Sequence, residues 1–191
     1  MDKIIKDLID TNADILADRT EIKITKNIDK IERAYLKNKI NVEKIYLPEG
    51  LKTISEEAFA NCRNLKYIYI PDTVTEIRQE AFCNCSSLKS IHLPKNLKVI
   101  SRCIFKHCTN LENIFIPQGV HTIEWRAFEE CTSLKEINLP NSIIEIENGA
   151  FYDCRKLVKI TIPRSILSLS NDLFYNCTDL TYITLHYLSI L

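Results

Sequence analysis

The cysteines are the residues whose chemistry has to be decided first. A cysteine can be a catalytic nucleophile, a metal ligand, half of a disulfide or a small apolar side chain. Catalysis needs one exceptional cysteine beside a base, not several equivalent ones. Six of the eight cysteines follow one another at intervals of 23 residues: Cys62, Cys85, Cys108, Cys131, Cys154 and Cys177. This equal spacing favours a packing role.

Disulfide and metal roles are the remaining alternatives for the thiols. Neighbouring periodic cysteines would be close enough to bond, but side chains that point in parallel directions suit a disulfide poorly. Cys83 and Cys103 lie outside the series. Together with Cys85, His107 and Cys108 they form a group of Cys and His residues of the types that ligate zinc. The periodic members should face inward, so we expect no metal and no cofactor. Cys83 and Cys103 stay candidates for reactive surface thiols.

Other residue types repeat with the same 23-residue period as the cysteines. A fixed period of this size is typical of a repeat protein, in which each unit buries its apolar side against its neighbours. One series is Phe59, Phe82, Phe105, Phe128, Phe151 and Phe174. A second series contains all the prolines: Pro48, Pro71, Pro94, Pro117, Pro140 and Pro163.

The repeating unit reads as a strand, a proline turn, a return segment and a short helix. Ile68 and Ile70 alternate with outward-facing residues, as in a strand, and Pro71 ends it because proline has no N–H to donate. Val74 and Ile77 fit an extended or loosely coiled return path. The following segment, residues 78–85, is predicted to form a turn of helix.

The predicted fold is an α/β repeat solenoid, a superhelix of 23-residue units with a parallel sheet on its concave face and short helical turns on its convex side. Helical apolar spacing over residues 1–20 predicts an N-terminal capping helix. Residues 21–43 match the unit weakly and are interpreted as a degenerate first repeat. Residues 44–191 form the array. No polar cap is visible in the final "LHYLSIL".

The unit "LKYIYIPDTVTEIRQEAFCNC" and its five counterparts resemble the BspA-like class of leucine-rich repeats. The resemblance is carried by the L-x-x-I-x-[IL]-P strand, the aliphatic residues after proline and the A-F-x-x-C turn. It covers residues 43–185 and implies a curved solenoid that binds or adheres, in many members at a microbial cell surface. Common leucine-rich repeats have an asparagine ladder after the strand. The sequence implies none here, since Thr73, Asn96, Gly119 and Ser142 occupy that region.

Charge and hydropathy exclude several partners. The formal net charge is zero, with 25 basic and 25 acidic residues, which argues against nucleic acid as the main partner. No apolar run is long enough to span a membrane, and "MDKIIKDLID" is no signal peptide. These features and the free thiols favour the cytoplasm, whereas the family resemblance favours the cell surface.

The predicted binding site is an aromatic cluster on the concave face. The outward strand positions of the first repeats hold Tyr46, Tyr67, Tyr69, His92 and Phe115. Exposed aromatic clusters are typical of recognition sites, although aromatic residues also favour strands for packing reasons. The expected partner is a protein or peptide, with a glycan as an alternative. Trp125, on the opposite side, is either an isolated surface residue or part of a second contact.

These observations predict a non-enzymatic protein-binding module that acts in adhesion or surface recognition. The alternative is a structural spacer, or a fragment of a larger repeat protein, that self-associates through its C-terminal end. No Gly-rich phosphate loop, H-E-x-x-H or G-x-S-x-G motif is present, so no sequence motif indicates an enzyme.

Overall fold

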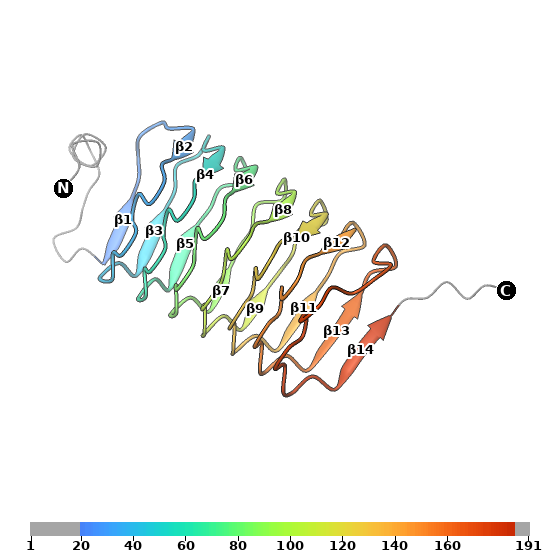
Figure 1. The fold of residues 1–191 in the computed structure, drawn as a ribbon. Helices are drawn as coiled ribbons and strands as arrows, with labels where there is room; N and C mark the ends of the chain where they lie inside the picture. Colours follow the sequence, from blue (N-terminus) through green and yellow to red (C-terminus); the bar gives the residue numbers. More distant parts are fainter. Residues whose placement is uncertain (1–19, 186–191) are drawn as a thin grey trace.

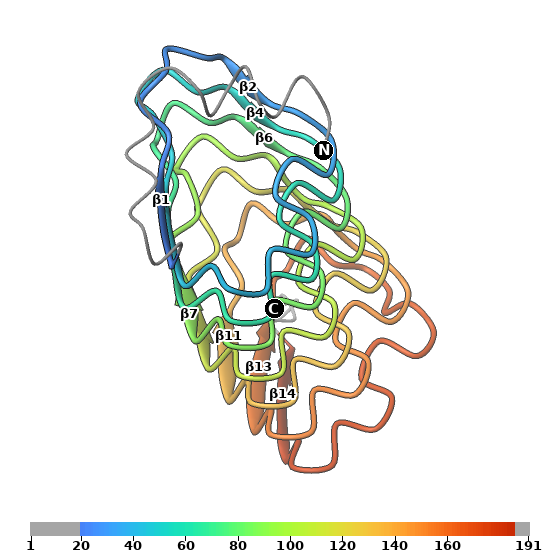
Figure 2. The same ribbon diagram turned by 90° about the vertical axis from the view of Figure 1, so that its left-hand side faces the viewer.

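The computed structural model describes residues 20–185, which form a parallel β-solenoid (Figure 1). Successive coils lie side by side along one axis, and the turned view shows the same path repeated with a steady displacement from coil to coil (Figure 2). Each coil contributes a strand to the main strand row, which consists of β1 (Glu21–Lys23), β3 (Lys44–Tyr46), β5 (Tyr67–Tyr69), β7 (Ser90–Ile91), β9 (Asn113–Ile114), β11 (Glu136–Asn138), β13 (Lys159–Ile162) and β14 (Tyr182–Leu185).

The return segments, predicted only as extended or loosely coiled, form a second row of short strands. An aliphatic side chain faces the core from each of them, which explains the second apolar pair of the repeat. The second strand row consists of β2 (Lys30–Ile31), β4 (Thr53–Ile54), β6 (Glu76–Ile77), β8 (Val99–Ile100), β10 (Thr122–Ile123) and β12 (Glu145–Ile146).

Pairing in both rows is parallel and keeps the 23-residue register. Glu21 lies opposite Lys44, and Lys159 lies opposite Tyr182. The main strand row is divided into the paired groups β1-β3-β5, β7-β9 and β11-β13-β14, with a single bridge from Phe115 to Asn138. The predicted parallel sheet is thus present as three short sheets in one row.

Side chains at equivalent positions stack into columns inside the solenoid. The six periodic phenylalanine rings are nearly parallel, with interplanar angles of 6–21° and neighbouring centroids 5.4–5.8 Å apart. All but Phe174 are fully buried. Each ring contacts the next coil, so apolar burial joins the coils as the repeat pattern predicts.

The prediction of short helical turns is wrong: the structure has consecutive β-turns and no helix within residues 20–185. Successive backbone N–H groups in these turns donate hydrogen bonds alternately to their own turn and to the next coil. Ala58 and Ala60 donate to residues three positions earlier, whereas Phe59 and Asn61 donate to the next coil. A helix needs every N–H to bond within its own segment, so this alternation excludes one.

Left-handed residues enforce this alternation. Two residues in this turn of each coil have positive φ, as Glu57 (57°) and Asn61 (62°) do in one coil and Glu80 (58°) and Asn84 (60°) do in the next. Such residues interrupt any right-handed helix, because αL is not a helical conformation for L-residues. The predicted capping helix over residues 1–20 lies, except for Thr20, outside the described residues. Within residues 20–185, no helix is long and apolar enough to cross a membrane.

Candidate binding face and the buried thiols

The six periodic thiols lie in one column and donate hydrogen bonds to backbone carbonyls. Cys131 Sγ donates to the Phe105 carbonyl at 3.3 Å, and that carbonyl also accepts the Cys108 N–H at 3.0 Å. The same contact recurs from Cys62 to Cys177 at 3.1–3.3 Å. A thiol therefore serves as a small apolar side chain with a weak donor, which agrees with the packing interpretation.

Burial makes these thiols poor nucleophiles. Desolvation raises the pKa of Cys62 and of Cys177 to about 11, and it raises the pKa of the fully enclosed Cys131 well above its ordinary value. A nucleophilic cysteine needs a lowered pKa and access to solvent. The column has neither property, and all the cysteines are free thiols.

Cys83 and Cys103, the candidates for reactive surface thiols, are also buried. Desolvation raises the pKa of both, to about 11 for Cys83. The structure therefore corrects the expectation of reactive surface thiols. Within the described part of the chain, no three His, Cys, Asp or Glu side chains gather as metal ligands.

The first half of the predicted binding cluster is brought together on β3 and β5. Strand register places Tyr46 opposite Tyr69, and the Tyr46 and Tyr67 rings are 5.6 Å apart at a tilt of 52°. Tyr67 is 46% exposed and Tyr69 is 39% exposed. The Tyr69 hydroxyl donates to Glu49 at 2.6 Å, a bond that raises the pKa of Tyr69. These rings form a supported aromatic surface.

His92 and Phe115 continue the same row beyond β5, although no strand pairing is assigned between β5 and β7. The His92 side chain is exposed, with Nε2 3.8 Å from Asp72 Oδ1. Phe115 is 64% exposed, one of the most open apolar side chains of the described residues. The cluster therefore consists of a contiguous tyrosine group and two further rings along the row.

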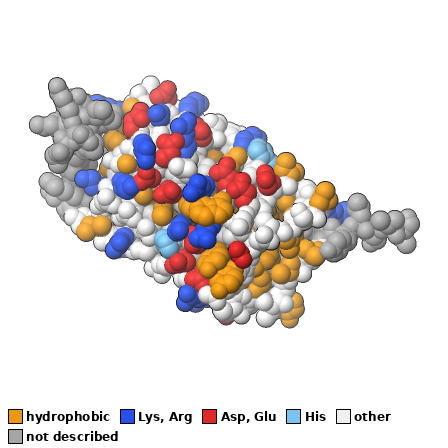
Figure 3. All heavy atoms as spheres, in the orientation of Figure 1, with side chains coloured by type: hydrophobic (Ala, Val, Ile, Leu, Met, Phe, Trp, Pro, Cys, Tyr) orange, Lys and Arg blue, Asp and Glu red, His pale blue; other side chains and the backbone are white. Residues whose placement is uncertain are grey.

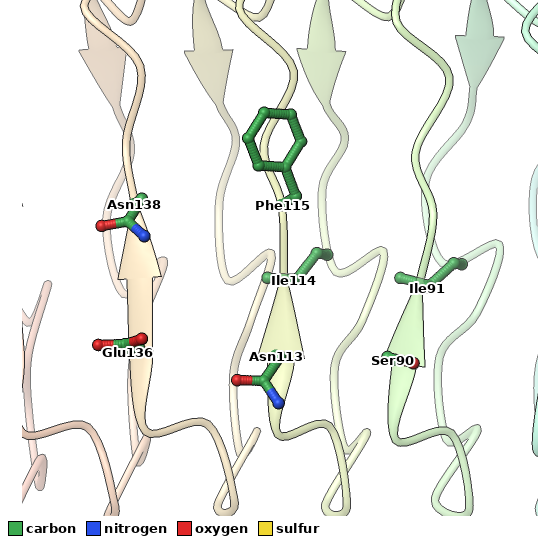
Figure 4. Close-up of a pocket in the computed structure, with 7 residues that line it drawn as sticks. All are labelled: Ser90, Ile91, Asn113, Ile114, Phe115, Glu136 and Asn138. Atoms are coloured by element: carbon green, nitrogen blue, oxygen red, sulfur yellow. The ribbon is translucent and has the colours of Figure 1, made fainter.

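A shallow hollow of about 310 Å³ adjoins Phe115. Figure 4 shows Ser90, Asn113 and Glu136 at one level of three neighbouring strands, with Phe115 and Asn138 at the next level. The hollow combines one aromatic ring with amide, hydroxyl and carboxylate groups. Such a mixture can fix the orientation of a ligand while the ring supplies contact area.

Trp125 is not isolated but belongs to a stack of cations and rings on another side of the solenoid. The guanidinium groups of Arg102 and Arg126 lie 4.6 and 4.7 Å from its ring centre, on consecutive coils. Arg126 also lies 5.2 Å from the Tyr152 ring, which stacks on Tyr175 at 4.7 Å. Figure 3 shows apolar side chains interleaved with Lys and Arg on one face. These contacts hold neighbouring coils together.

The family follows from a comparison with known repeat families. The model of the BspA-type leucine-rich repeat region matches residues 16–116 and 98–189, with six copies. This match covers most of the chain. The chain belongs to the BspA-type leucine-rich repeat family.

Solved structures of bacterial leucine-rich repeat proteins are similar to this BspA-type chain. One from Eubacterium ventriosum has 26% identity and a TM-score of 0.78, over 90% of this chain and 45% of its own length. One from Bacteroides ovatus has 26% identity and a TM-score of 0.68, over 87% and 61%. One from T. pallidum has 27% identity and a TM-score of 0.55, over 91% and 78%. No curated protein matches the chain. Repeats of this family are generally protein-interaction modules, and typically non-enzymatic.

A polar ladder in this BspA-type array was missed from the sequence. It lies in the consecutive β-turns that precede each periodic cysteine, not after the strand, where an asparagine ladder was sought. Asn61 Nδ2 donates to Asn38 Oδ1 and Asn84 Nδ2 donates to Asn61 Oδ1, both at 2.8 Å. Asn176 donates to Asp153 in the last coils. The signal was present, because Asn or Asp precedes most of the periodic cysteines and both residues tolerate αL.

Proposed function

We propose that this chain is a non-enzymatic module that binds a protein or peptide through the face formed by Tyr46, Tyr67, Tyr69, His92 and Phe115. The observation that carries the proposal is the exposure of several rings on one row of paired strands. Rings fixed on a solenoid give large contact area with little loss of conformational entropy on binding. Adhesion or surface recognition is the role such a module would serve.

Composition along the same row supports a local site. On β11 and β13, beyond Phe115, the outward positions carry Asn138 and Thr161, and Lys159 pairs with Glu136 at 3.1 Å; an exposed ring, Tyr182, returns only on β14. Charged and small polar side chains of this kind keep a surface solvated and contribute little binding energy. The partner is therefore expected to contact the N-terminal half of the row, with apolar side chains against the rings and polar groups against the hollow.

The test compares two double variants for binding of proteins captured from the native organism. Tyr69→Ser with Phe115→Ser removes two exposed rings from the proposed face. Ile144→Ser with Leu167→Ser removes two exposed apolar side chains away from the proposed face. Partners retained by the wild type and the second variant but lost from the first support the proposal. Equal binding by all three proteins refutes it, provided that circular dichroism shows the same fold.

Self-association through the C-terminal end is the second candidate function. It is favoured by the exposure of Ile183 and Leu185, whose equivalents Ile160 and Ile162 are buried in the preceding coil. Static light scattering of the 191-residue chain across a concentration series is the direct test. A constant monomer mass at high concentration would exclude this function and leave the binding face unaffected.

A further inference from the structure

The hollow beside Phe115 lies where the outward side chains of the main strand row become short. At one outward position, successive coils carry Tyr67, Ser90, Asn113 and Glu136. Ser90 and Asn113 are the short members of this series, and the pairing of β7 with β9 places them side by side. The hollow opens over these two residues, with Glu136 on its margin, and has a volume of about 310 Å³. Small-molecule sites begin at about 300 Å³, so the hollow accommodates one compact ligand unit.

The floor of the hollow offers little apolar surface. Ile91 and Ile114 form it, and they are only 7% and 8% exposed. Figure 4 shows them between the two levels of outward side chains. The ring of Phe115 is 64% exposed and is the large apolar surface among the lining residues. An apolar side chain of a ligand would find no pocket to enter here. A ligand that fits must instead be apolar on the face that meets the ring and polar at its edge.

The polar side chains around the hollow are open to such a ligand. Asn113 and Asn138 are exposed, and within residues 20–185 neither side-chain amide has a hydrogen-bond partner. Each amide carries two N–H donors and one carbonyl acceptor. Glu136 Oε2 lies 3.1 Å from Lys159 Nζ, so the one charged residue that lines the hollow is already paired. The hollow therefore presents donors and acceptors together without an unbalanced charge.

The ring of a neutral sugar matches this combination of groups. The C–H bonds of a pyranose give it an apolar face, and its hydroxyl groups, each a donor and an acceptor, lie around its edge. Its apolar face can stack on Phe115 while neighbouring hydroxyls bond to the amides of Asn113 and Asn138. A peptide strand matches less well, because it binds by pairing with the edge of a sheet, whereas this hollow is on the outward face of paired strands.

We propose that the hollow binds a neutral sugar residue carried by the protein partner, and this proposal rests on the proposed function above. The exposed tyrosines of β3 and β5 would contact the polypeptide of that partner, and Phe115 would stack on its sugar. The two contacts lie on one strand row, with His92 between them. Each contact strengthens the other, because once one has formed the second is intramolecular.

Saturation-transfer NMR with free sugars tests the hollow separately from the tyrosines. The probes are the methyl pyranosides of glucose, galactose and mannose, together with N-acetylglucosamine. At least one should bind, with a millimolar Kd because the hollow is shallow, and its C–H protons should receive saturation from the aromatic ring. The parallel bridge from Phe115 to Asn138 fixes the ring and one amide relative to each other, so epimers should differ at least threefold in affinity.

Four variants locate the bound sugar. Phe115→Ala removes the stacking surface and Asn138→Leu replaces the amide with an apolar group of similar size, so each should weaken binding at least tenfold. Phe115→Tyr keeps the ring and should bind within twofold of the wild type. Tyr182→Ala is the matched control, since Tyr182 is another ring on the same row and is 70% exposed. It should bind as the wild type does, and all four variants should keep the wild-type unfolding midpoint.

The outcomes distinguish this proposal from the proposed function. Sugar binding that is lost in Phe115→Ala and Asn138→Leu, together with release of a captured protein by excess of the same sugar, supports the proposal. Binding of none of the four sugars, or equal binding by every variant, overturns it and leaves a captured protein partner standing. Sugar binding at Phe115 without any captured protein overturns the protein partner and, with it, the source of the sugar.

Discussion

Truncation of Phe128 to alanine tests whether the ring column joins the coils. Phe128 is fully buried, and its ring lies 5.5 Å from each of two neighbours, Phe105 and Phe151. Removing a buried phenylalanine costs about 3–5 kcal/mol through lost transfer energy and the cavity that remains. The variant also loses two ring contacts, each about 0.5–1.5 kcal/mol, one to each adjacent coil. The expected loss of unfolding free energy is therefore near the upper end of this range.

Urea unfolding followed by circular dichroism measures this loss. With an m-value of about 3 kcal/mol per molar, a loss of about 4 kcal/mol lowers the midpoint by roughly 1.3 M. Phe174→Ala is the control, since that ring is half-buried and has one ring neighbour. It should lower the midpoint by about half as much. Equal shifts for both variants would contradict the reasoning, because a continuous column requires an interior ring to matter more than a terminal one.

Three further changes follow from single contacts. Gly149→Ala places a Cβ 3.3 Å from Arg126 Cγ at a φ of +63°, so we expect a loss of about 1 kcal/mol and altered fluorescence of the single tryptophan as the guanidinium shifts. Asn84→Gly and Asn84→Ala both lose the hydrogen bond from the Asn84 side chain to Asn61. Glycine adopts the positive φ of this position without strain and alanine does not, so Asn84→Ala should have the lower thermal unfolding midpoint of the two variants. Folding raises the pKa of Cys62 to about 11 from 9.0, so the neutral thiol is favoured in the folded state. That contribution is complete below pH 9.0 and is lost as the pH rises toward 11, so the urea midpoint should fall over this range, and by less for Cys62→Ala.

The interior of the fold could be predicted from the sequence because it depends on residue type and spacing. A column of rings needs a phenylalanine at the same place in every coil, and a 23-residue spacing states that requirement directly. The same holds for the prolines, which end the strands because they lack an N–H. Thus Phe128, Cys131 and Pro140 each locate a position in the coil before any coordinates are known.

The conformation of the segment before each periodic cysteine could not be predicted in the same way, because apolar spacing does not distinguish a helix from consecutive turns. Ala81, Phe82 and Cys85 face one side in either conformation. The deciding feature is the backbone at Glu80 and Asn84, where φ is positive. Glutamate gives no sequence signal for αL. Burial of Cys83 and Cys103 was missed for the same reason, since their direction depends on these turns.

The same repeat shows where function can differ from one coil to the next. The inward phenylalanine and cysteine positions hold the same residue from Phe59 to Cys177, and the other inward positions keep an apolar residue, because each must fit between its neighbours in a close-packed column. The outward position between the inward pair has no such neighbour above it, and it changes from Tyr46 and Tyr69 to Phe115, then to Asn138 and Thr161. Residues at this outward position can differ from coil to coil without disturbing the packed interior, so binding specificity can be encoded there. Binding specificity in this protein is therefore expected to follow the outward row, and exchanging Phe115 with Asn138 should move the binding site by one coil without changing the midpoint of unfolding.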